Sequence, residues 1–212
     1  MLKNVCWLVT GNETHKQEAS NSIRTFIALE LLPEINQAIA EYVAPLRALD
    51  RNISWTKAEN VHCTLKFLGD TPKPQIEKVA TVLHEACMSF APIDAEIIGS
   101  GVFPNEHRAR VLWIGIEENS GKLAELAQRI EIECRCLGFP KEERGFTAHL
   151  TIGRVKEGKA ANIVKALREQ PFPSRQIAFH ECTLMKSELH SAGSIYTPLQ
   201  KFAFRRERGL NG

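Results

Sequence analysis

The sequence contains little that would mark a membrane, secreted or zinc-binding protein. No apolar run approaches the roughly 20 residues of a membrane-spanning helix. Residues 1–10 include only five consecutive apolar positions, too few for a secretory signal. Six cysteines in 212 residues do not form a disulfide scaffold, and the lack of a Cys-x-x-Cys pair argues against a zinc site. A cytoplasmic location is therefore expected by default.

Signatures of several enzyme classes are missing as well. There is no Gly-x-Ser-x-Gly of a serine hydrolase, and Gly99-Ser-Gly101 is not followed by the Gly-Lys of a nucleotide-binding loop. A metal hydrolase would place carboxylates next to its histidines, whereas Asp70 lies in a turn-like stretch beyond an expected strand. The net charge of +2 is too small to indicate nucleic-acid binding by itself.

What remains is an ordinary globular composition with room for a core. The 212 residues are 43% hydrophobic and 25% charged, which fits one large domain or two small lobes. Residues 10–22 are polar and lack periodicity. We therefore expect residues 1–21 to be a flexible N-terminal extension and residues 22–208 to form a single bilobal domain.

One short pattern occurs twice. The stretches His62-Cys-Thr-Leu-Lys-Phe-Leu-Gly69 and His149-Leu-Thr-Ile-Gly-Arg154 both read His-x-Thr-apolar, and their histidines are 87 residues apart (149 − 62 = 87). Each copy lies in a strand-like run with a glycine at or near its end. Because side chains alternate along a strand, each histidine should share a face with the threonine two residues later.

Two imidazoles and two hydroxyls suit acid–base chemistry on a phosphate. Histidine titrates near a pKa of about 6.5, so one ring could take a proton from water while the other donates one to the leaving oxygen. The hydroxyls of Thr64 and Thr151 would hold the non-bridging oxygens as charge builds there. An activated phosphodiester would require no metal and no cofactor. A Cys–His nucleophile is disfavoured, since alternation turns Cys63 away from His62.

The remaining periodicity predicts an α+β chain built as two similar halves. We expect helices over residues 33–49, 74–89, 119–137 and 160–169, with a turn over 69–72 and a loop over 99–105. Strands are expected over residues 23–29, 53–55, 61–68, 93–98, 110–116, 147–155, 176–187 and 196–204. Each half then contains one motif strand. The two lobes, each with an antiparallel-type sheet and helices, would face each other across an active-site cleft.

The paired motifs resemble those of the two-histidine (2H) phosphoesterase superfamily. Within it, the chain is similar to the RNA 2′,3′-cyclic phosphodiesterase family, also called 2′-5′ RNA ligase-like. The resemblance extends over residues 23–206 and includes Arg24-Thr-Phe-Ile-Ala28, Trp55, Gly99-Ser-Gly-Val-Phe-Pro104, Arg110-Val-Leu-Trp-Ile-Gly115 and the stretch from Tyr196 to Phe204. Two positions depart from the family: Ala148 often is proline there, and Cys63 is commonly leucine or isoleucine. Neither position is expected on the catalytic face.

The resemblance implies a bilobal fold and hydrolysis of RNA 2′,3′-cyclic phosphate ends to 2′-phosphates. It implies that His62 is the proton donor, that His149 is the proton acceptor, and that Arg154 lies near the nucleotide. Phe67 could stack on a base. By alternation from His62, however, Phe67 should point into the core unless the strand bulges.

The expected partner is RNA with 2′,3′-cyclic phosphate ends, tRNA fragments included. No membrane partner is expected, and the chain is expected to act as a monomer. Two alternatives stay open: a 2′-5′ RNA ligase that joins tRNA halves, and a protein that binds RNA ends without turnover.

Overall fold

The computed structural model describes residues 21–158, 160–190 and 193–205. The predicted extension therefore lies outside the described residues except for Asn21, and so do the last three residues of the predicted domain. The boundaries of both stay predictions. Among the described helices, none is both long and apolar enough to cross a membrane.

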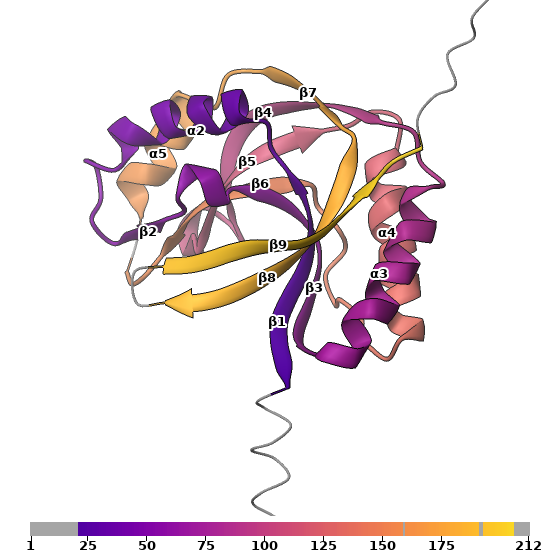
Figure 1. Cartoon of the computed structure of the whole chain (residues 1–212). Coiled ribbons are helices and arrows are strands. Elements are labelled where there is room, and N and C mark those ends of the chain that lie inside the picture. Colours follow the sequence, from indigo (N-terminus) through magenta and orange to yellow (C-terminus); the bar gives the residue numbers. More distant parts are fainter. Residues whose placement is uncertain (1–20, 159, 191–192, 206–212) are drawn as a thin grey trace, which may run out of the picture.

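The described strands form one antiparallel sheet in the order β7-β4-β5-β6-β3-β1-β8-β9, with β2 paired to β6 (Figure 1). Their bounds are β1 (Ser22–Glu30), β2 (Ile53–Trp55), β3 (His62–Pro72), β4 (Ile93–Phe103), β5 (Val111–Glu117), β6 (His149–Val155), β7 (Arg175–Phe179), β8 (Glu181–His190) and β9 (Gly193–Ala203).

The two motif strands occupy the middle of this order. β3 continues into β1, β8 and β9 on one side, and β6 continues into β5, β4 and β7 on the other. The α+β class and the two similar lobes predicted from the sequence are therefore confirmed. Their sheets are joined where Cys63 of β3 pairs with Leu150 of β6.

Each lobe is covered by one helix from each half of the chain. The helices are α2 (Pro33–Leu46), α3 (Lys73–Cys87), α4 (Lys122–Cys136) and α5 (Ala161–Glu169). Figure 1 shows α2 beside α5 and α3 beside α4. α2 reaches β4 through Tyr42, whose hydroxyl lies 2.8 Å from the Ser100 hydroxyl, while α4 and α3 both contact β3. The first helix of each half thus packs in the lobe that contains the motif strand of the other half: α2 with β6, and α4 with β3.

The helices form where apolar residues recur every three or four positions. In α2 the buried side chains are Ile35, Ile39, Val43 and Leu46, which makes one stripe along the helix. The predicted end at residue 49 is too late, because α2 ends at Leu46. Beyond Leu46 the backbone bonds shorten to a tighter turn, because the N–H groups of Ala48 and Leu49 donate to carbonyls only three residues earlier.

Two segments predicted to be irregular are strand instead. Residues 69–72 belong to β3 and pair with β1, and residues 99–103 belong to β4 and pair with β5. Gly69 and Gly99 have φ of +72° and +69°. They lie at shifts of register in the two ladders, so glycines that suggested turns form β-bulges within continuous strands.

Two other predicted boundaries also differ. The strand predicted over 176–187 is interrupted at His180, because β7 pairs with β4 whereas β8 pairs with β1 and β9. The helix predicted from residue 119 begins at Lys122. The Glu118 carboxylate accepts hydrogen bonds from the backbone N–H groups of Ser120 and Leu123, so a side chain ahead of the helix satisfies an N–H group in its first turn.

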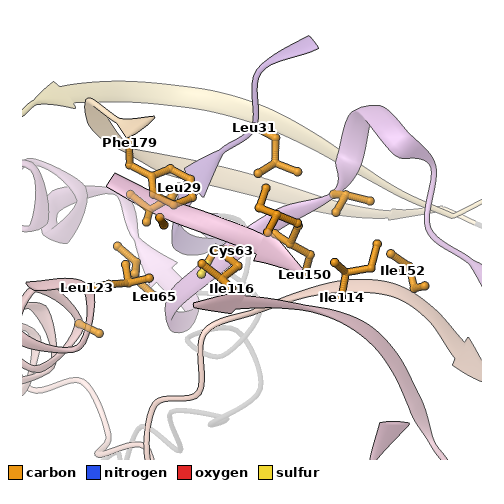
Figure 2. Close-up of a cluster of buried hydrophobic side chains, with 14 of the residues drawn as sticks. Leu29, Leu31, Cys63, Leu65, Ile114, Ile116, Leu123, Leu150, Ile152 and Phe179 are labelled. Carbon is orange, nitrogen blue, oxygen red and sulfur yellow. The ribbon is translucent and has the colours of Figure 1, made fainter. Parts of the chain in front are cut away.

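The main core lies between the sheet and the helices. Figure 2 shows side chains from several elements meeting there, among them Leu29, Cys63, Ile114 and Leu150, all with 0% exposure. A second, smaller cluster contains Phe26, Ala28 and Met185, with Tyr196 packed against it. Since side chains alternate along β1, Phe26 and Ala28 lie on the sheet face opposite Ile27 and Leu29 of the main core.

Candidate active site

The pairing of β3 with β6 brings the two motifs side by side. Cys63 pairs with Leu150 in antiparallel register, and both side chains are buried. Extending this register by one residue each way sets His62 beside Thr151 and Thr64 beside His149. All four side chains are half-buried, on the face opposite the buried Cys63, Leu65, Leu150 and Ile152. The predicted alternation within both motifs is therefore confirmed.

A backbone carbonyl orients each imidazole. Nδ1 of His62 donates to the Asn60 carbonyl oxygen at 2.8 Å, and Nδ1 of His149 donates to the Thr147 carbonyl oxygen at 2.7 Å. A carbonyl can only accept, so each Nδ1 carries the hydrogen. The Nε2 atom of each ring is then the one that gains or loses a proton during chemistry.

Both motif strands contain a bulge at the same place. In the β1–β3 ladder Ala28 pairs with Thr64 and Ile27 with Lys66, which leaves Leu65 without a partner. A bulge of this kind reverses which face the following residues occupy. Phe67 is consequently 55% exposed, which is the exception named for a bulged strand and not the core position that plain alternation predicts.

The second motif repeats this geometry. In the β5–β6 ladder Trp113 pairs with Thr151 and Leu112 with Gly153, so Ile152 is the unpaired residue. Arg154 is exposed as a result. Phe67 and Arg154 each lie five residues beyond their motif histidine. They therefore hold equivalent places on the two sides of the site.

In each motif strand, the residue that follows the unpaired bulge residue and precedes the exposed one is buried. Lys66 is 4% exposed, and its Nζ donates to Glu131 Oε2 at 2.7 Å and to the Pro140 carbonyl oxygen at 3.0 Å. Its counterpart is Gly153, where an added Cβ would lie 2.9 Å from Cγ2 of Ile53. Each bulge is thus fixed by packing on the helix-covered side, although by different means.

Aromatic side chains enclose His62 from two directions. The Phe26 ring stacks on the imidazole with centroids 4.8 Å apart, and Tyr196 meets it edge-on at 5.2 Å. These two aromatic rings also contact each other, at 5.0 Å. Ala28 lies between Phe26 and Glu30 on the same strand face, and its small side chain leaves room for the stack.

His149 has a different aromatic environment. Phe103 of β4 meets its ring edge-on at 5.2 Å and packs against Trp113 at the same centroid distance. Gly101 makes room for this arrangement, because a Cβ there would lie 2.5 Å from the Trp113 ring. The two histidines therefore have unequal surroundings within matching strand geometry.

Charge is distributed unequally as well. Glu30 is the β1 partner of His62, whereas the residue opposite His149 on β5 is Gly115. The Glu30 carboxylate accepts from the Thr183 hydroxyl at 2.7 Å and from Lys201 Nζ at 3.0 Å. A carboxylate beside one histidine but not the other breaks the symmetry of the site.

The protonation of His62 reflects these surroundings. Burial lowers the pKa of His62, and the positive charge of His149 acts in the same direction. The hydrogen bond to Asn60 and the charge of Glu30 oppose this change. Burial also raises the pKa of the Cys63 thiol to about 12, which makes it unfit as a nucleophile.

Several side chains at the site were not predicted as functional from the sequence. Phe26, Phe103, Trp113 and Tyr196 belong to stretches that resemble the family, yet no single residue among them was assigned a role. Strand alternation from Phe26 through Ala28 would have put Glu30 on the same face. The contacts of Phe103 and Tyr196 had no local signal, because they depend on pairings between distant strands.

Comparison with known proteins is consistent with this arrangement. The model of the LigT like Phosphoesterase family matches the chain twice, over residues 29–113 and 114–196. The RNA 2′,3′-cyclic phosphodiesterase of Methanothermobacter thermautotrophicus is 32% identical over 184 residues, covering 85% of this chain and 98% of the relative. That of Aquifex aeolicus is 33% identical over 186 residues, covering 85% and 96%.

Solved structures have the same fold. A crystal structure of a protein from Thermus thermophilus superposes with a TM-score of 0.73 at 26% identity, covering 87% of this chain and 100% of that one. The structure of E. coli LigT complexed with 3′-AMP gives a TM-score of 0.73 at 24% identity, covering 86% and 98%. At that identity the second likeness concerns the fold alone.

Proposed function

Because the chain belongs to the LigT like Phosphoesterase family, we propose that it hydrolyses the 2′,3′-cyclic phosphate ends of RNA to 2′-phosphates. One observation carries the proposal: the β3–β6 register places two imidazoles and two hydroxyls on one face of the sheet. A phosphodiester anion held there is contacted from both lobes.

In the proposed reaction, Nε2 of His149 takes a proton from water, and the water oxygen forms a bond to phosphorus. The bond from phosphorus to the 3′ oxygen breaks, and Nε2 of His62 gives that oxygen its proton. The hydroxyls of Thr64 and Thr151 donate to the non-bridging oxygens, where negative charge increases. The product is a 2′-phosphate beside a free 3′ hydroxyl.

The donor role of His62 requires that this ring be protonated when substrate is bound. Burial lowers its pKa in the free protein, which acts against the role. Glu30 opposes that effect, and a bound phosphodiester adds a further negative charge directly at the ring. We propose that substrate binding raises the pKa of His62 and so prepares the proton donor.

We propose that Phe67 and Arg154 contact the nucleotide on the two sides of the phosphate. Both are exposed at equivalent positions beyond the motif threonines. The Phe67 ring has a face available for base stacking, and the Arg154 guanidinium can stack on a base or pair with a phosphate. A bulge in each strand directs both side chains to the catalytic face.

We further propose that one copy of the chain is sufficient and that it acts in the cytoplasm on RNA ends, including those of tRNA fragments. A single chain supplies both histidines and both threonines. No step in the mechanism uses a group from a second copy, so the monomer is complete for this chemistry.

The test is product analysis with a short RNA that ends in a 2′,3′-cyclic phosphate, in the presence of EDTA. Wild type should yield the 2′-phosphate, and His149→Ala should not. Loss of turnover in EDTA would contradict the metal-free mechanism. An RNA with a 5′ hydroxyl is included in a parallel reaction, where a joined 2′-5′ product would instead indicate ligase activity.

A further inference from the structure

The His62 half of the site is completed by the β8–β9 hairpin near the end of the chain. We propose that Asn60 is a positioning residue that ties this hairpin to His62 and thereby holds the imidazole in its working place. The inference rests on the proposed function for its catalytic consequence. Its structural part, the tie itself, can be measured without any substrate.

Asn60 connects His62 to the hairpin through one hydrogen bond to each. Its backbone carbonyl accepts from Nδ1 of His62 at 2.8 Å, and its side-chain Nδ2 donates to the Ser194 carbonyl oxygen at 3.0 Å. Asn60 ends the short 3-10 turn η1 (Ala58–Asn60), and Ser194 is the second residue of β9, the second strand of the hairpin. One half-buried residue thus joins the start of β3 to the start of β9.

The hairpin also contacts the ring directly. Tyr196 lies two residues beyond Ser194, and its ring meets His62 at 5.2 Å and Phe26 at 5.0 Å. β9 is an edge strand of the described sheet and pairs with β8 alone (Figure 1). An edge strand with one neighbour opens more readily than a central strand. The bond from Asn60 adds an anchor at the end where Tyr196 must be held.

The other half of the site has no equivalent device in the described residues. Thr147 occupies the same position relative to His149, and its carbonyl accepts from Nδ1 at 2.7 Å. Thr147 is exposed, and within residues 21–158, 160–190 and 193–205 its hydroxyl makes no hydrogen bond. The carbonyl that orients His62 is therefore tied to a remote strand, whereas no such bond holds the Thr147 side chain in the described residues.

Two substitutions separate the tie from the carbonyl. Asn60→Ala keeps the backbone carbonyl for His62 and removes only the bond to Ser194. Asn60→Asp keeps the size as well, but presents a carboxylate oxygen to the Ser194 carbonyl, which repels it. We expect kcat to fall about tenfold in either variant, because one hydrogen bond that helps position the imidazole is lost. KM should change by less than about twofold.

The decisive readout is the NMR signal of the His62 ring protons. In wild type, the ring currents of Phe26 and Tyr196 should displace this signal from that of a free imidazole. Loosening the hairpin in Asn60→Ala should move the signal from its wild-type position and speed amide exchange in residues 194–196. Thr147→Ala is the matched comparison, and it should leave the His62 signal and the hairpin exchange as in wild type.

A His62 signal at its wild-type position together with wild-type kcat in Asn60→Ala would overturn the inference, and so would an equal response in Thr147→Ala. If Asn60→Ala fails to fold, Tyr196→Leu removes the hairpin's ring contact directly. That variant should lower kcat and move the His62 signal while amide exchange at Ser194 stays slow. An unchanged kcat and an unchanged His62 signal in Tyr196→Leu would also overturn the inference. Wild-type protein without turnover would refute the proposed function, while the NMR comparison would still decide whether the tie exists.

Discussion

Replacing Glu131, the ion-pair partner of the buried Lys66, should lower the free energy of unfolding more than replacing Lys66 itself. Lys66 lies in the β3 bulge with a 2% exposed side chain, and its ammonium group is 2.7 Å from Glu131 of α4. Glu131→Ala leaves that charge in the core with only the Pro140 carbonyl as a partner. Lys66→Met removes the charge and fills much the same volume, while Glu131, 23% exposed, can still reach water.

The magnitudes follow from the burial of each group. Breaking a fully buried ion pair from one side costs about 3–5 kcal/mol. Because Glu131 is partly exposed and so already partly hydrated, we reduce this to about 2–3 kcal/mol for Glu131→Ala. Replacing a buried charge with an apolar side chain of similar size is commonly near neutral, so Lys66→Met should change the free energy of unfolding by less than about 1 kcal/mol.

The assay is urea unfolding of both variants and of the double variant, followed by circular dichroism. The double variant should resemble Lys66→Met, since no charge is then left unpaired. Phe67 follows Lys66 directly, so Glu131→Ala should also loosen the bulge and weaken substrate binding. A larger loss of stability in Lys66→Met than in Glu131→Ala would refute the reasoning.

Three further predictions concern the site and its frame. Burial lowers the pKa of His62, and a bound phosphate anion raises it. In pH–rate profiles, kcat/KM, which reports the free enzyme, should therefore fall at a lower alkaline pH than kcat, which reports the enzyme–substrate complex. A fall of both parameters at the same pH would contradict this. Phe67→Ala should raise KM about five- to tenfold through lost stacking, which steady-state kinetics on cyclic-phosphate RNA would measure against Phe67→Tyr as the rescuing control. Gly153→Ala should destabilise the fold by about 1–3 kcal/mol in urea unfolding, because its Cβ would lie 2.9 Å from Ile53; wild-type stability would show that the contact can relax.

The sequence predicted the parts of the site that depend on local periodicity. Alternation placed His62 with Thr64 and His149 with Thr151, and the sheet places them on one face. The same rule failed at Phe67, since a bulge inserts one residue and exchanges the two faces. A bulge is set by the partner strand and by the burial of its neighbours, neither of which a single strand reveals.

Long-range pairing accounts for what the sequence could not predict. The glycines at 69 and 99 were interpreted as turn residues, but their ladders continue on both sides. Asn60 and Tyr196 are 136 positions apart (196 − 60 = 136), and only the folded sheet brings both to His62. The strand order, in which β8 and β9 return to β1, was likewise beyond local signals.

The exchange of α2 and α4 between the lobes means that the unit repeated in the sequence is not a unit that can fold alone. A fragment containing β1 to β5 would keep α2 and β4, but would lack α4, whose Glu131 neutralises Lys66 of β3. The complementary fragment would carry α4 without β3. Each half places a helix on the lobe of the other, as the subunits of a domain-swapped dimer do, but here the two halves are joined in one chain. Separated by a cut between β5 and α4, they would regain activity only by reassociation, at a rate set by their concentrations.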